Sequence, residues 1–144
     1  MNDIKVLFKK IHKNAKAPEY KHDGDSGCDL FVIEKFVIRP NEIRSTRTGI
    51  CIEISKGIEA QIRPRSGLSL KGLSIVNSPA TVDSGYRGEL VVPLINLGNE
   101  ILVFEVGDRF AQMIFAPVYR GHFIETKKLK DTSRNTDGFG SSGI

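Results

Sequence analysis

The sequence predicts an all-β fold, a single antiparallel sandwich or barrel, for three reasons. About ten short runs rich in β-branched and aromatic residues recur along the 144 residues. Gly, Pro, Asn and Asp separate these runs at close spacing, which is typical of antiparallel sheets. No segment shows the apolar period of a long amphipathic helix.

The runs can be placed in order along the chain. Residues 4–8 alternate apolar and polar side chains, as an edge strand does. The following strands are expected from about Asp29 and over residues 36–38, 44–54, 58–62, 73–76, 89–96 and 101–106. The last run, Arg109–Val118, is almost continuously apolar, which predicts a strand buried on both faces. Between these strands, Pro64 and two glycines argue against a long helix and leave one helical turn over residues 66–70.

Residues 74–94 contain two apolar runs on either side of VDSGYRG, and this pattern predicts a β-hairpin. Asp83 stands where the first run ends, and Tyr86 follows three residues later. A carboxylate held at the mouth of a rigid hairpin can take a proton from water, so Asp83 is a candidate general base. Asp is also a common turn former, and a capping role is the alternative for Asp83.

Composition narrows the class of protein. The length predicts one domain, with a β body over residues 1–132 and a mobile Gly/Ser-rich arm over residues 133–144. The chain has no apolar run of 18 residues and no secretory signal, and its two cysteines lack metal-ligand spacing, so a reducing cytoplasm is expected. The net charge of +4 suits an anionic ligand. The basic residues are scattered, so neither a nucleic acid nor a membrane is a predicted partner.

Two segments carry groups that suit phosphate. Arg65, Ser66 and Gly67 combine a cation, a hydroxyl and accessible backbone at a helix start. The tail from Arg134 to Gly143 repeats this combination and adds Phe139, an aromatic residue that could stack on a flat base. An exposed loop and a disordered tail are the alternatives. Gln112 lies inside an apolar run, where an amide needs hydrogen-bond partners that neighbouring backbone could supply.

Five motifs occur in order over nearly the whole chain, and together they resemble those of the homotrimeric dUTPases. The motifs are DGDSGCDL, PRSGLS, VNSPATVDSGYRGE, GDRFAQMIF and RNTDGFGSSG. The resemblance implies a jelly-roll fold, a threefold trimer with active sites shared between subunits, and Mg2+-dependent hydrolysis of dUTP to dUMP and pyrophosphate. That reaction would keep uracil out of DNA and supply dUMP for thymidylate synthesis.

The resemblance also implies roles for individual residues. Asp83 would activate the water that attacks the α-phosphorus, and Tyr86 would lie under the deoxyribose. The uracil would be read by Asn77, the main chain of Thr81, Val82 and Asp83, and the returning strand near Val91. The phosphates would be bound by Arg65, Ser66, Gly67 and Gln112, with Arg134, Gly140, Ser141 and Ser142 closing over them and Phe139 stacking on the base. Asp29 would contact Mg2+ only through water, since the triphosphate and water would supply most of the ligands of the metal.

Some positions depart from the family pattern. Ala80 and Asn135 stand where glycine is usual, and the methyl group of Ala80 could crowd the base slot. A dCTP deaminase of the same fold is an alternative, but it carries a glutamate where this chain has Pro93, which cannot act as an acid or base. A non-enzymatic binding module is a second alternative. It would not need both Asp83 and the phosphate-binding residues Arg65, Ser66 and Arg134.

Overall fold

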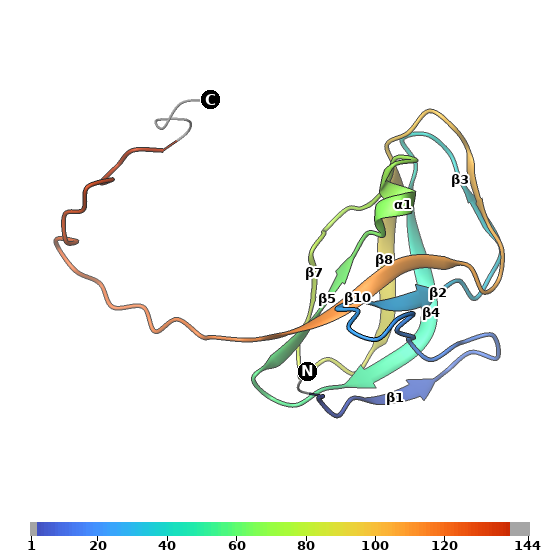
Figure 1. Cartoon of the computed structure of the whole chain (residues 1–144), viewed down its shortest axis with the longest axis horizontal. Helices are drawn as coiled ribbons and strands as arrows, with labels where there is room; N and C mark the ends of the chain where they lie inside the picture. Colours follow the sequence, from blue (N-terminus) through green and yellow to red (C-terminus); the bar gives the residue numbers. More distant parts are fainter. Residues whose placement is uncertain (1–2, 139–144) are drawn as a thin grey trace.

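The computed structural model describes residues 3–138, which form ten β-strands and one short helix (Figure 1). The elements in order are β1 Leu7–Lys10, β2 Cys28–Phe31, β3 Phe36–Ile38, β4 Ile43–Glu53, β5 Ile58–Arg63, α1 Ser66–Ser69, β6 Leu73–Ile75, β7 Ala80–Val82, β8 Glu89–Asn96, β9 Leu102–Phe104 and β10 Arg109–Pro117. The all-β prediction and the single helical turn after Arg65 are confirmed. Four residues of the predicted lid, Phe139, Gly140, Ser141 and Ser142, lie outside the described residues.

The strands form a jelly-roll-like sandwich of two four-stranded antiparallel sheets. One sheet has the order β1-β4-β8-β6, the other has the order β2-β10-β5-β7, and β3 and β9 form a separate pair. Each long strand turns alternate side chains inward, as in β8, where Leu90, Val92 and Leu94 are almost fully buried. These inward rows meet in one hydrophobic core.

The predicted hairpin over residues 74–94 is wrong in its pairing. β6 does pair with β8, with Ile75 opposite Leu94, but β7 pairs with β5 in the other sheet. Ala80 and Val82 are buried there, opposite Ile62 and Ala60. The chain therefore crosses from one sheet to the other and returns, because both sheets bury their apolar rows in the same core. Local turn signals do not specify which distant strand becomes the partner.

Two strand predictions also need correction. The first strand begins at Leu7 rather than Ile4 and pairs with the second half of β4. β10 is buried mainly on one face, since Ala111 and Met113 are 0% and 1% exposed while Gln112 and Ile114 are only partly buried. Phe110, which is also buried, lies where the register shifts between Arg109 and Ala111. The apolar run of β10 is continuous because Ala and Ile also occupy the outer face, where no second layer lies against them within the described residues.

After Pro117 the chain leaves the sandwich as an extended segment without regular strands, coloured orange to red in Figure 1. Tyr119 and Phe123 in this segment are 93% and 98% exposed. The apolar side chains of this segment therefore pack against no hydrophobic core in the described part of one chain. Within residues 3–138 no helix is long and apolar enough to cross a membrane.

The turn at Gly72, before β6, lies against the turn at Gly98, after β8, and a substitution at Gly72 tests this contact. The φ of Gly72 is +88°, and an added Cβ would overlap the backbone of Gly98. We predict that Gly72→Ala lowers the free energy of unfolding by about 3 kcal/mol or more, since left-handed strain and a backbone clash add together. Urea denaturation measures this value.

Gly57→Ala is the matched control, because Gly57 has φ +85° but open space around its Cα. It should cost only about 1–2 kcal/mol, the strain of the left-handed conformation alone. If the two variants lose the same free energy of unfolding, the contact with Gly98 does not contribute to the effect of Gly72→Ala.

Candidate functional site

Three adjacent strands place polar side chains in one row at the end of the second sheet. Asp29 on β2 lies opposite Gln112 on β10, which lies opposite Arg63 on β5. The Gln112 Nε2 group donates a hydrogen bond to the carbonyl of Pro64 at 2.8 Å, which is the backbone contact considered from the sequence. A side chain at Gly27 would overlap Gln112 Oε1, so the amide would have to move to make room for it.

Arg65 follows β5 and folds back over this row. Its Nε lies 2.8 Å from Asp29 Oδ1, and its Nη1 donates to the carbonyl of Arg109 at 3.1 Å. Arg109 Nη1 lies 3.2 Å from the other carboxylate oxygen of Asp29. Asp29 is 9% exposed, so one buried carboxylate holds two guanidinium groups.

Ser66 and Gly67 begin α1 directly after Arg65, and both are exposed. The first N–H groups of a helix have no partner within the helix, so they remain available to an acceptor. An added Cβ at Gly67 would meet nothing within 4 Å, and the surface above it is therefore open. Arg65, Ser66, Gly67 and Gln112 lie together as predicted, and their donors suit an anion.

Asp83 follows β7 in a tight turn that it shares with Tyr86. The Tyr86 N–H donates to the Asp83 carbonyl at 3.0 Å, and the Tyr86 hydroxyl donates to the Glu89 carbonyl at 2.9 Å. The Tyr86 ring lies so close to Gly88 that any side chain there would overlap it. The Asp83 carboxylate is exposed and has no hydrogen-bond or ion-pair partner among residues 3–138, so it is free to accept a proton from water.

The remaining predicted residues lie around the crossover between the sheets. Asn77 is exposed in the loop after β6, one residue beyond the bond from Val76 N–H to the Pro93 carbonyl. Thr81 is exposed and Val91 is 44% exposed, whereas Val82 is buried and can offer only its main chain. These residues border an open surface. They do not enclose a slot within one chain.

The expectation that Ala80 crowds a base slot is wrong. Ala80 is 7% exposed and belongs to the hydrophobic core opposite Ile62. Its methyl group therefore adds to packing between the sheets and does not project onto the surface beside Asp83.

The structure separates Asp83 from the anion-binding residues of the same chain. Val82 pairs with Ala60, so Asp83 lies beside Glu59 at one end of β5. Arg65 lies beyond Arg63, at the other end. The four residue steps from Glu59 to Arg63 span about 13 Å of strand. Asp83 and Arg65 therefore lie at opposite ends of the same strand within a single chain.

Arg134 is likewise not brought to the other residues. It lies in the extended segment, where its Nε donates to the Asp137 carbonyl at 2.9 Å. Asn135 has φ +42°, a left-handed conformation that glycine adopts most readily and Asn tolerates. This explains why Asn can stand at a position where glycine is usual.

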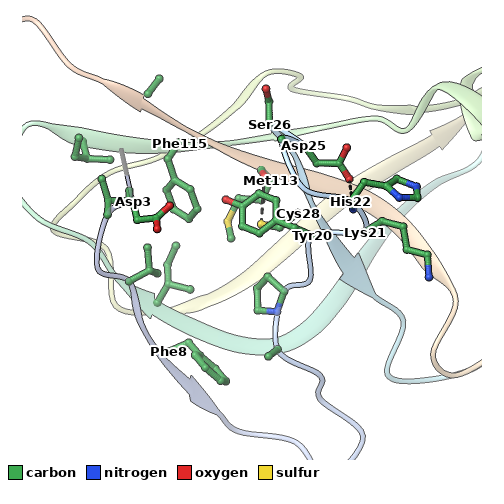
Figure 2. Close-up of a pocket in the computed structure, with 18 of the residues that line it drawn as sticks. Asp3, Phe8, Tyr20, Lys21, His22, Asp25, Ser26, Cys28, Met113 and Phe115 are labelled. Atoms are coloured by element: carbon green, nitrogen blue, oxygen red, sulfur yellow. Dashed lines mark hydrogen bonds between the residues drawn. The ribbon is translucent and has the colours of Figure 1, made fainter. Parts of the chain in front are cut away.

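A pocket of about 900 Å³ lies elsewhere, between β1, the 17–28 segment and the end of β10 (Figure 2). Its floor is apolar, with Phe8, Met113 and Phe115, and none of the predicted site residues lines it. Burial raises the pKa of the Tyr20 hydroxyl and of the Cys28 thiol here, which keeps both groups protonated at neutral pH. The pocket can hold apolar groups, and its polar lining includes Asp3, His22 and Asp25.

No cluster of three or more His, Cys, Asp or Glu side chains that could hold a metal occurs in the described part of the chain. Both oxygens of Asp29 are already paired with guanidinium groups. The donor set thus does not fit a metal bound directly by protein, whereas it leaves room for one carried by a ligand's phosphates and water.

Residue-by-residue prediction missed three members of this arrangement. Arg109, Gly27 and Gly88 all stand within the quoted motifs, so their positions carried a signal, but no role was assigned to them. The roles of Arg109 and Gly27 depend on contacts with Asp29 and Gln112 that arise only when separate strands are brought together, whereas Gly88 contacts Tyr86 within one turn.

Comparisons with known proteins identify the family of this chain. The dUTPase family model matches residues 13–143. A deoxyuridine 5'-triphosphate nucleotidohydrolase from Hydrogenobaculum sp. is 48% identical and covers 98% of this chain and 99% of its own length. One from Alkaliphilus metalliredigens is 49% identical, with 96% of this chain and 97% of its own length covered. Among solved structures, the Staphylococcus bacteriophage 80alpha dUTPase with dUPNHPP superposes with a TM-score of 0.89 at 27% identity, over 97% of this chain and 99% of that one. This chain belongs to the dUTPase family.

Proposed function

We propose that this dUTP diphosphatase cleaves dUTP to dUMP and pyrophosphate by means of a water molecule that Asp83 activates. The observation that carries the proposal is the Asp83 carboxylate, which is exposed at a tight turn and unpaired within residues 3–138. An ionised carboxylate in water contact can orient a water molecule and accept its proton as the oxygen attacks the α-phosphorus. The bond from phosphorus to the bridging oxygen then breaks, and pyrophosphate leaves.

In this proposal the phosphates bind to the residues around Arg65, which lie at the end of β5 opposite Asp83. Arg65 supplies charge, Ser66 and Gly67 supply a hydroxyl and N–H groups, and the second amide hydrogen of Gln112 is still available. Mg2+, when bound, would neutralise charge on the phosphates and keep most of its ligands as phosphate oxygens and water. Asp29 would reach it only through water.

The base and sugar bind along the crossover. The main chain of Thr81, Val82 and Asp83, with Asn77 and the strand near Val91, would offer donors and acceptors that match the edge of uracil. Cytosine carries an amino group where uracil carries a carbonyl, and that reversal would leave buried groups unpaired. Tyr86 is fixed by its bond to the Glu89 carbonyl, so its ring can serve as a rigid support under deoxyribose.

We further propose that the active chain is a homotrimer with shared sites. The separation of Asp83 from Arg65 along β5 supports this, since a second copy could bring its Arg65 cluster to face Asp83. The exposed apolar residues of the 118–129 segment also support assembly, because they need cover from another chain. The tail from Arg134, including Phe139, Gly140, Ser141 and Ser142, would then close over a neighbouring site as a lid.

The first test is the Asp83→Asn variant. Asparagine keeps the size of the side chain but cannot accept the proton, so we expect pyrophosphate release from dUTP to fall by about two to four orders of magnitude. Nucleotide binding should change little. A variant that releases pyrophosphate at nearly the normal rate would remove Asp83 from the mechanism.

The second test is deletion of residues 134–144. We expect turnover of dUTP to be crippled while the sandwich stays folded, since no core residue lies among 134–138, the described part of this segment. Circular dichroism and sedimentation check the fold and the assembly, and a phosphate-release assay checks activity. If the shortened chain hydrolyses dUTP as fast as the complete one, the lid role is wrong.

The third test addresses assembly through Tyr119 and Phe123. Replacing both with Ser removes apolar surface that is almost fully exposed in one chain. We expect the trimer of this variant to dissociate at a higher protein concentration than the wild-type trimer does, as measured by sedimentation velocity. Activity should fall in proportion to the fraction of monomer. The matched control replaces Leu70, also 91% exposed but on the sandwich beside α1, with Ser. Unchanged sedimentation of the Tyr119 and Phe123 variant would exclude this segment from the interface.

A further inference from the structure

Asp29 is the one carboxylate at the phosphate-binding end that is both buried and doubly ion-paired in the described part of the chain. It is 9% exposed, with Arg65 Nε 2.8 Å from one oxygen and Arg109 Nη1 3.2 Å from the other. A charge in this position is costly unless it is paired, so the cluster is held together as a unit. Neither Asp29 oxygen is left as a strong site for a further cation.

Arg65 is consequently fixed before any ligand arrives. Its Nε is held by Asp29, and its Nη1 is held by the Arg109 carbonyl at 3.1 Å. An ion pair at one nitrogen and a hydrogen bond at another restrict both the position and the plane of the guanidinium group. Its Nη2 has no hydrogen-bond partner among residues 3–138. Gln112 adds support from behind, since it holds the Pro64 carbonyl that precedes Arg65.

The charge of the cluster also matters. One carboxylate pairs with two guanidinium groups, so the cluster keeps an excess positive charge even though Arg65 is ion-paired. If Asp29 paired with Arg65 alone, it would cancel the charge that Arg65 offers to an anion. Sharing Asp29 with Arg109 lets the carboxylate orient Arg65 without neutralising it.

We infer that Asp29 is a positioning residue, which holds the Arg65 guanidinium in the plane and direction needed to bind the nucleotide phosphates. This inference rests on the proposed function, because it assigns Arg65 to the phosphates. It differs from the role of a metal partner for Asp29, since the effect on phosphate binding passes through Arg65 and does not require Mg2+.

A double-mutant cycle on binding of the imido analogue dUPNHPP tests the inference. Affinity is measured by calorimetry with excess EDTA and again with Mg2+, for the wild type, Asp29→Asn, Arg65→Gln and the double variant. We expect each single substitution to weaken binding about 10- to 100-fold in EDTA, because a charge-assisted contact is lost or misplaced. The double variant should bind no more weakly than Arg65→Gln alone, since the two residues act as one unit.

Asp23→Asn is the matched control, because Asp23 is exposed, lies six residues before Asp29 and undergoes the same change of charge. It should bind the analogue like the wild type. Arg65→Lys is the second variant. It keeps the positive charge but lacks the guanidinium group that contacts both Asp29 and the Arg109 carbonyl. If Asp29→Asn fails to fold, a loss of affinity in Arg65→Lys comparable to that in Arg65→Gln still supports positioning, and wild-type affinity in Arg65→Lys overturns it.

Two results would overturn the inference while leaving the proposed function intact. One is additive losses in the double variant. The other is wild-type affinity of Asp29→Asn in EDTA with weaker binding only in Mg2+, which would make Asp29 a metal partner. Wild-type affinity of Arg65→Gln would instead contradict the assignment of Arg65 to the phosphates, and with it the proposed function.

Discussion

The pairing of β7 with β5 is the constraint on which the rest of the structure depends. β7 has only three residues, and it is held by two buried side chains, Ala80 and Val82. A slip of one residue would turn both of them outward, so the register is well defined. The register places Asp83 at the Glu59 end of β5, while Arg65 leaves from the opposite end. One chain thus presents Asp83 and Arg65 in two separate regions.

Two carboxyl side chains, the buried Asp29 and the partly buried Glu89, organise these two regions. At one end Asp29 ties Arg65 and Arg109 together across β2 and β10. At the other end Glu89 accepts bonds from Arg47 Nε at 2.9 Å and from the Gly49 N–H at 2.7 Å, beside the irregular register of β4 and β8. The Glu89 carbonyl also receives the Tyr86 hydroxyl. Buried polar groups of this kind are costly to leave unpaired, so each carboxylate makes its surroundings rigid.

Particular elements show how far sequence reasoning reaches. The strand at residues 36–38 and the helical turn after Arg65 were predictable, because Pro, Gly and β-branched residues act through local geometry. The hairpin over residues 74–94 was not, because an apolar run does not state which sheet it will join. Ala80 illustrates the same limit, since a residue beside a functional aspartate turned out to belong to the core.

The sequence by itself determined the fold class, the approximate positions of the strands and, through five ordered motifs, the family. These features follow from local propensity and from the identity and order of residues along the chain. Only the tertiary structure decided that β7 joins β5, that Asp83 and Arg65 lie apart, and that Asp29 is occupied by two arginines. The reason is physical: these facts depend on contacts between residues up to 80 positions apart, made when two sheets share one core.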